Sequence, residues 1–364
     1  MTHPLMGADP LTLARALVRG GGVSAAHLPT VGAACAASLF RVPFTAAERL
    51  WAALRSRRSS SAPPPLFLLG HWRSGTTHLY NTLARDPRFG WVEPVATGLP
   101  WDFLLLGRAL RPLLERQLPA DRAIDRIPVT PDAPQEDEAA LANMQTLSLY
   151  HGLYFPRRFR DRVMEGVFFD GTTRAQRERW LRRFRLFHDK LRLRWPGRRV
   201  VIKNPVYTAR VALIREVFPD ARFIHIHRNP YVVFQSMRRF YRVLLDTLAL
   251  QIERPDPNEI DAVILDVYAR MMEAYDADVS GLGPERLVEV RFEAFEADPE
   301  PTLTRVYAAL ELGDFEPVRD RIAAYVASVC GYRKNRHTFD PASREAVEAR
   351  WGRWIERWGY APPA

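Results

Sequence analysis

The sequence predicts an α/β fold in three layers, with a central, mainly parallel sheet flanked by helices. Four short apolar segments have the length and composition of buried strands, and they span residues 66–69, 200–202, 222–227 and 287–292. Each of them is followed by apolar residues at helical spacing. Strands that alternate with helices in this way are typical of parallel sheets.

The first 58 residues are predicted to form an N-terminal helical arm, and residues 59–364 a single α/β domain. The arm has apolar positions at helical spacing, with a break expected at Pro43. Its longest apolar stretch, residues 31–40, is shorter than the roughly 20 residues that cross a membrane, so we expect no spanning helix. Two interpretations stay open: an arm packed on the core, or an interfacial helix with a basic margin on an anionic membrane.

The first strand leads into a glycine loop at residues 70–75 and then into a helix from Thr76. This order directs backbone N–H groups at an anion. Gly70 and Gly75 have P-loop spacing, which indicates a P-loop-like fold, but Thr76 stands where a triphosphatase has lysine, and Arg73 lies inside the loop. The loop therefore predicts a phosphate cradle that neither transfers a γ-phosphate nor needs magnesium. An ordinary strand-turn-helix with an incidental arginine is the alternative.

Two acidic features follow the loop helix. Glu93 lies in Trp91-Val92-Glu93-Pro94, and Glu136 lies in an acidic run at residues 135–138. Either carboxylate is a candidate general base. The run also fits the start of a helix over residues 139–149, because carboxylates suit the first turn of a helix.

Two more strand ends carry cations. Lys203 ends the second strand and Arg228 the third. Ligands of open α/β sheets bind at the carboxyl ends of the strands, which favours a functional Lys203 over one that merely ends a strand. Ser236 follows Arg228 by two helical turns, so a guanidinium and a hydroxyl can grip one phosphate together. A triphosphatase would have an acidic residue at the end of this strand.

With these motifs the sequence resembles the sulfotransferases, which transfer a sulfuryl group from 3′-phosphoadenosine 5′-phosphosulfate (PAPS) to an acceptor. The similarity covers residues 64–340 and is to the branch that contains the protein-tyrosine sulfotransferases and many bacterial homologues. It implies that Arg228 and Ser236 hold the 3′-phosphate and that Lys203 lies against the sulfate. It also implies a 5′-phosphosulfate loop made of Arg73, Ser74, Gly75, Thr76 and Thr77.

The resemblance also implies a base and a closing loop. In the branch with a loop arginine, a glutamate base follows the loop helix at about the distance of Glu93, and Glu136 is the second candidate. Residues 331–336 resemble a basic C-terminal loop that closes over the nucleotide, with Arg333 and Lys334 as its candidate contacts. The sequence departs from many relatives at Trp72, where they have proline.

The chemistry that the resemblance implies is an in-line displacement at sulfur by a hydroxyl or amine, with release of adenosine 3′,5′-bisphosphate (PAP). Fixed cations such as Arg73 and Lys203 lower the barrier as charge grows on the leaving oxygen. PAPS is the expected co-substrate. No metal is expected, because the cations replace it and Cys35 and Cys330 lack the spacing of metal ligands.

The formal net charge of +10 suits acidic partners. We expect a small-molecule or lipid acceptor, peripheral membrane contact through residues 1–58 as a second possibility, and no nucleic acid. Two cysteines do not make a disulfide framework, so a reducing compartment is expected: the cytoplasm, at the inner membrane face if the arm binds lipid.

Two other classes of protein stay open. One is a P-loop kinase or other phosphotransferase, which Thr76 at the lysine position disfavours. The other is a non-catalytic basic protein bound to membrane or nucleic acid. That class leaves the loop and the spacing of Arg228 and Ser236 unexplained.

Overall fold

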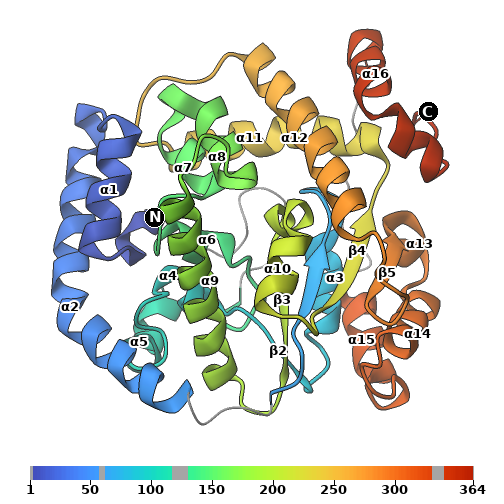
Figure 1. Cartoon of the computed structure of the whole chain (residues 1–364), viewed down its shortest axis with the longest axis horizontal. Coiled ribbons are helices and arrows are strands. Elements are labelled where there is room, and N and C mark those ends of the chain that lie inside the picture. The colour runs from blue at the N-terminus through green and yellow to red at the C-terminus, as the bar shows by residue number, and fades with distance from the viewer. Residues whose placement is uncertain (1–2, 57–61, 117–129, 330–339, 364) are drawn as a thin grey trace. The chain divides into compact units, whose positions relative to one another are not determined.

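The computed structural model describes residues 3–56, 62–116, 130–329 and 340–363 (Figure 1). The chain forms two compact units, each assembled from separate segments. Unit 1 comprises Met1–Pro63, Trp91–Arg198 and Phe240–Ile260, and unit 2 comprises Pro64–Gly90, Arg199–Arg239 and Asp261–Ala364. Residues 1–58 fall within unit 1. The division into an arm and a single domain stays a prediction.

Unit 2 contains a five-stranded sheet in the order β2-β3-β1-β4-β5, and every pair of neighbouring strands is parallel. The strands are β1 Leu66–Leu69, β2 Phe89–Gly90, β3 Arg199–Lys203, β4 Arg222–His227 and β5 Leu287–Arg291. All four side chains of β1 are buried, as expected of a strand covered on both faces. The predicted α/β fold with a parallel sheet flanked by helices is confirmed.

The register of the sheet brings the predicted strand ends to one edge. Leu68 of β1 pairs with Lys203 of β3, and Leu69 pairs with His225 of β4. At the end of β4, His227 pairs with Arg291 of β5. Because all these strands are parallel, the residues that follow them emerge at the same edge of the sheet.

The helices of unit 2 surround this sheet (Figure 1). They are α3 Thr76–Leu83, η4 Pro205–Ala209, α10 Val211–Val217, α13 Phe292–Ala297, α14 Pro299–Ala309, η5 Glu316–Val318, α15 Arg319–Val329 and α16 Pro341–Arg357. Two helices are shared by the units along their length, α11 (Pro230–Leu248) and α12 (Pro257–Asp278). The ring of Phe67 packs at 5.7 Å from that of Tyr207 and 6.0 Å from that of Phe223, which fixes η4 and β4 to β1.

Unit 1 has helices and loops, and its described residues include no strand. Its helices are η1 Pro4–Gly7, α1 Pro10–Gly20, η2 Ala25–His27, α2 Leu28–Ser56, α4 Pro94–Gly98, α5 Leu106–Glu115, α6 Glu138–Ala142, α7 Leu149–Tyr154, η3 Pro156–Arg158, α8 Phe159–Phe168 and α9 Arg174–Arg194. Helix α9 starts with a capping box between Thr173 and Gln176. Its inner face buries Trp180, stacked on Phe184 at 4.9 Å.

Helix α2 differs from the prediction because it continues through Pro43. Proline removes one backbone donor and clashes with the preceding turn, and it usually kinks or ends a helix. Here it lies on the exposed side, while Arg41 and Thr45, on either side of it, both donate to the carboxylate of Asp102. These two anchors hold the helix across the missing hydrogen bond.

The predicted helix over residues 139–149 is also wrong. Helix α6 starts at Glu138 but ends at Ala142, and α7 begins only at Leu149. The buried carboxylate of Glu138 accepts hydrogen bonds from the Ser148 hydroxyl at 2.7 Å and from the Leu149 N–H at 3.1 Å. The side chain of Glu138 therefore caps the start of α7, and α6 ends after five residues.

Candidate functional site

The loop between β1 and α3 has a conformation that requires its glycines. Gly70 has a φ of 138°, and a Cβ atom there would lie 2.4 Å from the carbonyl oxygen of Ile226. Gly75 has a φ of 90°, and its Cβ would lie 2.0 Å from the ring of Phe292. Arg73 between them has a φ of 70°, which is unusual for a residue with a side chain. Strained backbone of this kind occurs at ligand-binding sites.

Neighbouring segments of unit 2 brace the loop. The Gly70 N–H donates to the Thr208 hydroxyl at 2.8 Å, and both residues are buried. Within the loop, the Ser74 N–H donates to the His71 carbonyl at 3.2 Å. Helix α3 then starts at Thr76, and the first N–H groups of an α-helix have no acceptor inside it. The sequence does not indicate this role of Thr208, because only the tertiary structure brings η4 to the loop.

Arg73, Arg228 and Ser236 meet next to the loop. Arg73 Nε donates to Ser236 Oγ at 2.9 Å, and Arg228 Nη1 donates to the carbonyl of Arg73 at 3.1 Å. Ser236 is buried on the first part of α11, and Arg228 follows the end of β4. The sheet therefore unites the loop with both residues that the sequence predicts for the 3′-phosphate.

Phe292 joins the loop to Arg228. Its ring fills the space at Gly75, and the guanidinium carbon of Arg228 lies 4.5 Å from the centre of the same ring. Phe292 comes directly after β5, whose last residue Arg291 pairs with the end of β4. The sequence predicts a strand over residues 287–292, but it does not indicate this supporting role of Phe292.

Lys203 lies on the other side of β1. Its Nζ is 3.4 Å from Thr77 Oγ1, and its side chain is almost fully buried at the end of β3. The structure thus brings together Lys203 and the loop helix, as the order of the strands requires. Arg333 and Lys334, predicted to close over the nucleotide, lie outside the described residues.

The electrostatics of this edge suit an anion with more than one charge. Burial lowers the pKa of Arg228, and the nearby Arg73 lowers it further, while Glu296 and Glu293 oppose the shift. Two guanidinium groups held close together favour an anionic ligand that neutralises both. The loop backbone can also approach such a ligand closely because Gly70 and Gly75 have no side chain. The residues present therefore fit the two phosphates of PAPS.

Metal ligands do not gather in the described part of the chain, where no three His, Cys, Asp or Glu side chains lie together as an ion site.

The two candidate bases belong to unit 1. Glu93 is the N-cap residue of α4 and is buried, and Arg194 binds it with two hydrogen bonds, Nε to Oε2 at 2.7 Å and Nη2 to Oε1 at 2.9 Å. Arg111 adds a longer contact at 3.5 Å. Both oxygens of the Glu93 carboxylate therefore already accept hydrogen bonds from a guanidinium group, which suits a residue that positions its neighbours.

Glu136 is half-buried in the segment beside Glu93. The N–H of Gln135 donates to the carbonyl of Val92 at 2.8 Å, so one backbone hydrogen bond joins the chain neighbours of the two glutamates. The structure therefore brings together, within unit 1, the two acidic features that the sequence separates by more than forty positions.

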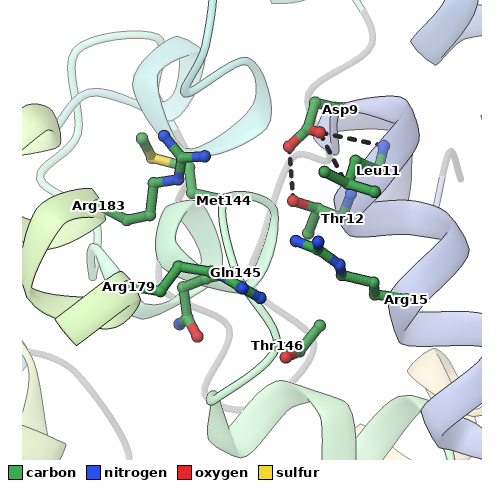
Figure 2. A pocket seen from close by; sticks show the side chains of 9 residues that line it. All are labelled: Asp9, Leu11, Thr12, Arg15, Met144, Gln145, Thr146, Arg179 and Arg183. Atoms are coloured by element: carbon green, nitrogen blue, oxygen red, sulfur yellow. Dashed lines mark hydrogen bonds between the residues drawn. The ribbon is translucent and has the colours of Figure 1, made fainter. Parts of the chain in front are cut away.

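A separate pocket of unit 1 has a cationic lining (Figure 2). It lies between the start of α1, the segment after α6 and a half-buried side of α9. Its lining residues are Asp9, Leu11, Thr12, Arg15, Met144, Gln145, Thr146, Arg179 and Arg183. Burial lowers the pKa of Arg179, and Arg15 and Arg182 lower it further. None of these residues belongs to the predicted nucleotide motifs, which makes the pocket a source of control variants.

The parallel sheet, the glycine loop and the cations at the strand ends define an α/β enzyme that binds a nucleotide and transfers an anionic group. The chain belongs to the sulfotransferase family, because the family model matches residues 64–317. It catalyses sulfuryl transfer, and the family implies PAPS as the donor. The kinase and the non-catalytic alternatives are not supported.

Two comparisons find mycobacterial proteins that are similar to this chain. It is 32% identical over 299 residues to the omega-hydroxy-beta-dihydromenaquinone-9 sulfotransferase Stf3 of Mycobacterium tuberculosis and of Mycobacterium bovis, which covers 82% of this chain and 76% of that protein. Its fold is similar to the crystal structure of sulfotransferase STF9 from Mycobacterium avium, with a TM-score of 0.66, 17% identity and coverage of 98% and 97% of the two chains. The crystal structure of sulfotransferase STF1 from Mycobacterium tuberculosis is also similar, with a TM-score of 0.63, 16% identity and coverage of 94% of this chain and 90% of that chain.

Proposed function

We propose that this sulfotransferase transfers the sulfuryl group of PAPS to a hydroxyl group of a lipid-soluble acceptor and releases PAP. The observation that carries the nucleotide part is the cluster of Arg73, Arg228 and Ser236 beside the glycine loop. Two cations and a hydroxyl that meet at the carboxyl edge of a parallel sheet suit a nucleotide with two phosphate groups.

Each residue of this edge has a proposed role. Arg73, Ser74, Gly75, Thr76 and Thr77 bind the 5′-phosphate. Arg228 and Ser236 bind the 3′-phosphate and so fix the position of the nucleotide. Lys203, held beside Thr77, stabilises the negative charge that grows on the leaving oxygen. PAPS supplies an activated sulfuryl group, and no proton is needed on its leaving phosphate.

For the general base we propose Glu136, with Glu93 as a positioning residue. This reverses the order of preference from the sequence, because both oxygens of the Glu93 carboxylate already accept hydrogen bonds from Arg194. The base removes the proton of the acceptor hydroxyl as the hydroxyl oxygen attacks sulfur. Glu93 instead holds α9 to α4 and keeps the segment of Glu136 in place.

Steady-state rates with labelled PAPS test these roles. Glu136→Gln is expected to lower kcat by about 10²–10⁴-fold, and Lys203→Met by about 10²–10³-fold, while both variants still bind PAP. Glu93→Gln is expected to lower the unfolding temperature, while the folded variant keeps most of its kcat. A folded Glu93→Gln enzyme without turnover, beside an active Glu136→Gln enzyme, would reverse the two assignments.

The proposed acceptor is an isoprenoid or other apolar molecule with a hydroxyl group. The support is the named acceptor of the Stf3 relatives, an ω-hydroxylated dihydromenaquinone. Transfer of labelled sulfate to an ω-hydroxylated menaquinone in detergent is the expected result. Transfer only to soluble sugars or to a tyrosine peptide would contradict the lipid acceptor and leave sulfuryl transfer intact.

We further propose that the enzyme works in the cytoplasm and contacts the inner membrane face through residues 1–58. A membrane-bound acceptor and a net charge of +10 support this location. Fractionation of cells that express the full chain tests it, and the enzyme is expected in the membrane fraction at low salt.

A further inference from the structure

Helix α2 has an outer face that is apolar along most of its length. Every exposed residue of α2 from Leu28 to Ala47 is apolar, proline or glycine. The large side chains of this outer face are between 39% and 67% exposed, and they are Leu28, Leu39, Phe40, Val42, Phe44, Leu50 and Leu54. Among the described residues, every large apolar side chain with such exposure belongs to unit 1, and most lie on α2. Figure 1 shows α2 beside α1, which covers only part of it.

The inner face of α2 has no large apolar side chain: its buried residues are two alanines, Ala34 and Ala52, and the polar Ser38, Arg41 and Glu48. Ser38 Oγ donates to the carbonyl of Ala8 at 2.8 Å, and Arg41 and Glu48 are buried. Arg41 pairs with Asp102 at 2.5 Å, and Glu48 pairs with Lys190 at 2.7 Å. A helix on the surface of a protein in water has the opposite pattern, with apolar residues inside and charges outside. The outer face therefore suits a non-aqueous surrounding.

Helical geometry shows how wide this face is. At about 100° per residue, the exposed apolar positions cover an arc of roughly 200°, and Arg49 and Arg55 lie at its two margins. A second helix would cover only a narrow stripe of such an arc. A bilayer surface covers a wide arc, and arginines at its margins reach the phosphate groups of the lipids.

The charge of α2 points to anionic lipid. Its only carboxylate is that of Glu48, which is buried and paired with Lys190. Arg49 and Arg55 are both exposed, and Arg57 and Arg58 follow in the sequence. Basic groups beside an apolar helix face are attracted to anionic headgroups.

We propose that α2 lies in the plane of an anionic membrane with this outer face in the lipid. By length and composition, residues Ala25–Arg55 form a helix that could also cross a bilayer, and only 17% of the apolar window is buried. A crossing helix would have to break the pairs of Arg41 with Asp102 and of Glu48 with Lys190, and would leave charges without partners. Helix α2 therefore lies on the membrane and does not cross it. This refines the membrane contact proposed above, and its test needs no enzymatic activity.

Vesicle flotation of the full chain tests the proposal. The wild-type protein is expected to float with vesicles of phosphatidylcholine and phosphatidylglycerol, and more weakly with phosphatidylcholine alone. Phe40→Asp with Leu50→Asp is expected to weaken binding roughly tenfold or more, because two side chains can no longer enter the lipid. Both positions are exposed, so the fold should be unaffected, and a thermal unfolding curve checks this.

A matched control carries the same added charge elsewhere. Ala323→Asp with Ala324→Asp places two carboxylates on exposed positions of α15 in unit 2, and it should float like the wild type. Absence of flotation in the wild type, or flotation of the α2 variant equal to that of the control, overturns the proposal.

Two further measurements test whether α2 is instead a dimer interface or a helix that crosses the membrane. Sedimentation velocity is expected to give the same oligomeric state for the wild type and for the α2 variant. A wild-type dimer that the variant dissociates would assign the outer face to a second copy of the chain. An alkaline wash should release the protein from vesicles, and retention would instead indicate a crossing helix.

Discussion

The side chain of Arg73 donates from Nε to the hydroxyl of Ser236 at 2.9 Å. The two residues lie 163 positions apart, and the hydrogen bond joins the glycine loop to the first part of α11. Nucleotide binding would exchange this bond for bonds from both groups to phosphate oxygens. The loop and the two residues proposed to bind the 3′-phosphate, Arg228 and Ser236, are therefore expected to act together in binding the nucleotide.

The first prediction concerns this hydroxyl. Ser236→Ala removes one charge-assisted hydrogen bond, which is worth about 1.5–3 kcal/mol, and is expected to weaken PAP binding by about ten- to a hundredfold. Calorimetric titration measures the affinity. Ser328→Ala on α15, which removes an exposed hydroxyl bonded to the carbonyl of Tyr325 at 2.6 Å, should leave the affinity unchanged. Equal affinities of the two variants would contradict a role of Ser236 in the nucleotide site.

A second prediction separates backbone strain from a steric clash. Gly75→Ala forces a left-handed backbone on alanine, which costs about 1–2 kcal/mol, and it also drives a Cβ into the ring of Phe292, which adds about 1–3 kcal/mol. Gly197→Ala has the strain alone, because nothing lies within 4 Å of its Cβ position at a φ of 72°. Chemical unfolding should show the larger loss for Gly75→Ala, together with loss of PAP binding. Equal losses would mean that Phe292 does not support the loop.

The third prediction concerns the stability of the protein at acidic pH. Burial lowers the pKa of His71 to about 4, although a hydrogen bond to the carbonyl of Trp72 opposes the shift. The unfolded chain binds a proton on this histidine below pH 6.5 and the folded chain does not, so stability falls as the pH falls from 6.5 towards 4. Between pH 7 and pH 5 this lowers the free energy of unfolding by about 2 kcal/mol. In His71→Gln the decline should be shallower by that amount, and parallel curves for the two proteins would show that His71 is not the group responsible.

The fourth prediction concerns the buried pair beneath α2. Lys190→Met leaves the Glu48 carboxylate buried without its cation and is expected to cost about 3–5 kcal/mol of stability. Lys190→Met with Glu48→Leu removes both charges and should recover most of that loss. Denaturant titration of the two variants checks this. A double variant as unstable as the single one would indicate that packing, and not charge, holds α2 at this point.

Much of the candidate site at the carboxyl edge of the sheet could be predicted from the sequence because its residues follow strands. Arg73, Lys203 and Arg228 each come at or just after the end of an apolar segment, and parallel strands end at one edge. Ser236 could be added because it lies in the helix that starts at Pro230, two residues after Arg228. Local spacing was therefore sufficient for these positions.

Other residues could not be predicted, because their partners are distant in the sequence. Nothing local indicates that the hydroxyl of Thr208 binds the Gly70 N–H, or that Phe292 fills the space at Gly75. Glu93 is bound by Arg194, 101 positions away, so its contact with α9 cannot be predicted from the residues around it.

Helix α2 shows a second reason why parts of the structure could not be predicted from the sequence. Its periodicity indicates two faces, but periodicity does not tell which face is buried. The polar face turns inward because Arg41 and Glu48 find Asp102 and Lys190, and these partners come from segments far along the chain. The same partners let the helix continue through Pro43, where local rules predict a break.

The most direct measurement is a calorimetric titration of PAP into the wild type, Arg228→Ala and Arg179→Ala. Each variant loses one positive charge, but Arg179 lines the pocket of unit 1 (Figure 2) and not the loop. We expect micromolar binding to the wild type and to Arg179→Ala, and none to Arg228→Ala. Failure of the wild type to bind PAP, with binding of ATP instead, would contradict the assignment of the loop and of Arg228 to the phosphates of PAPS.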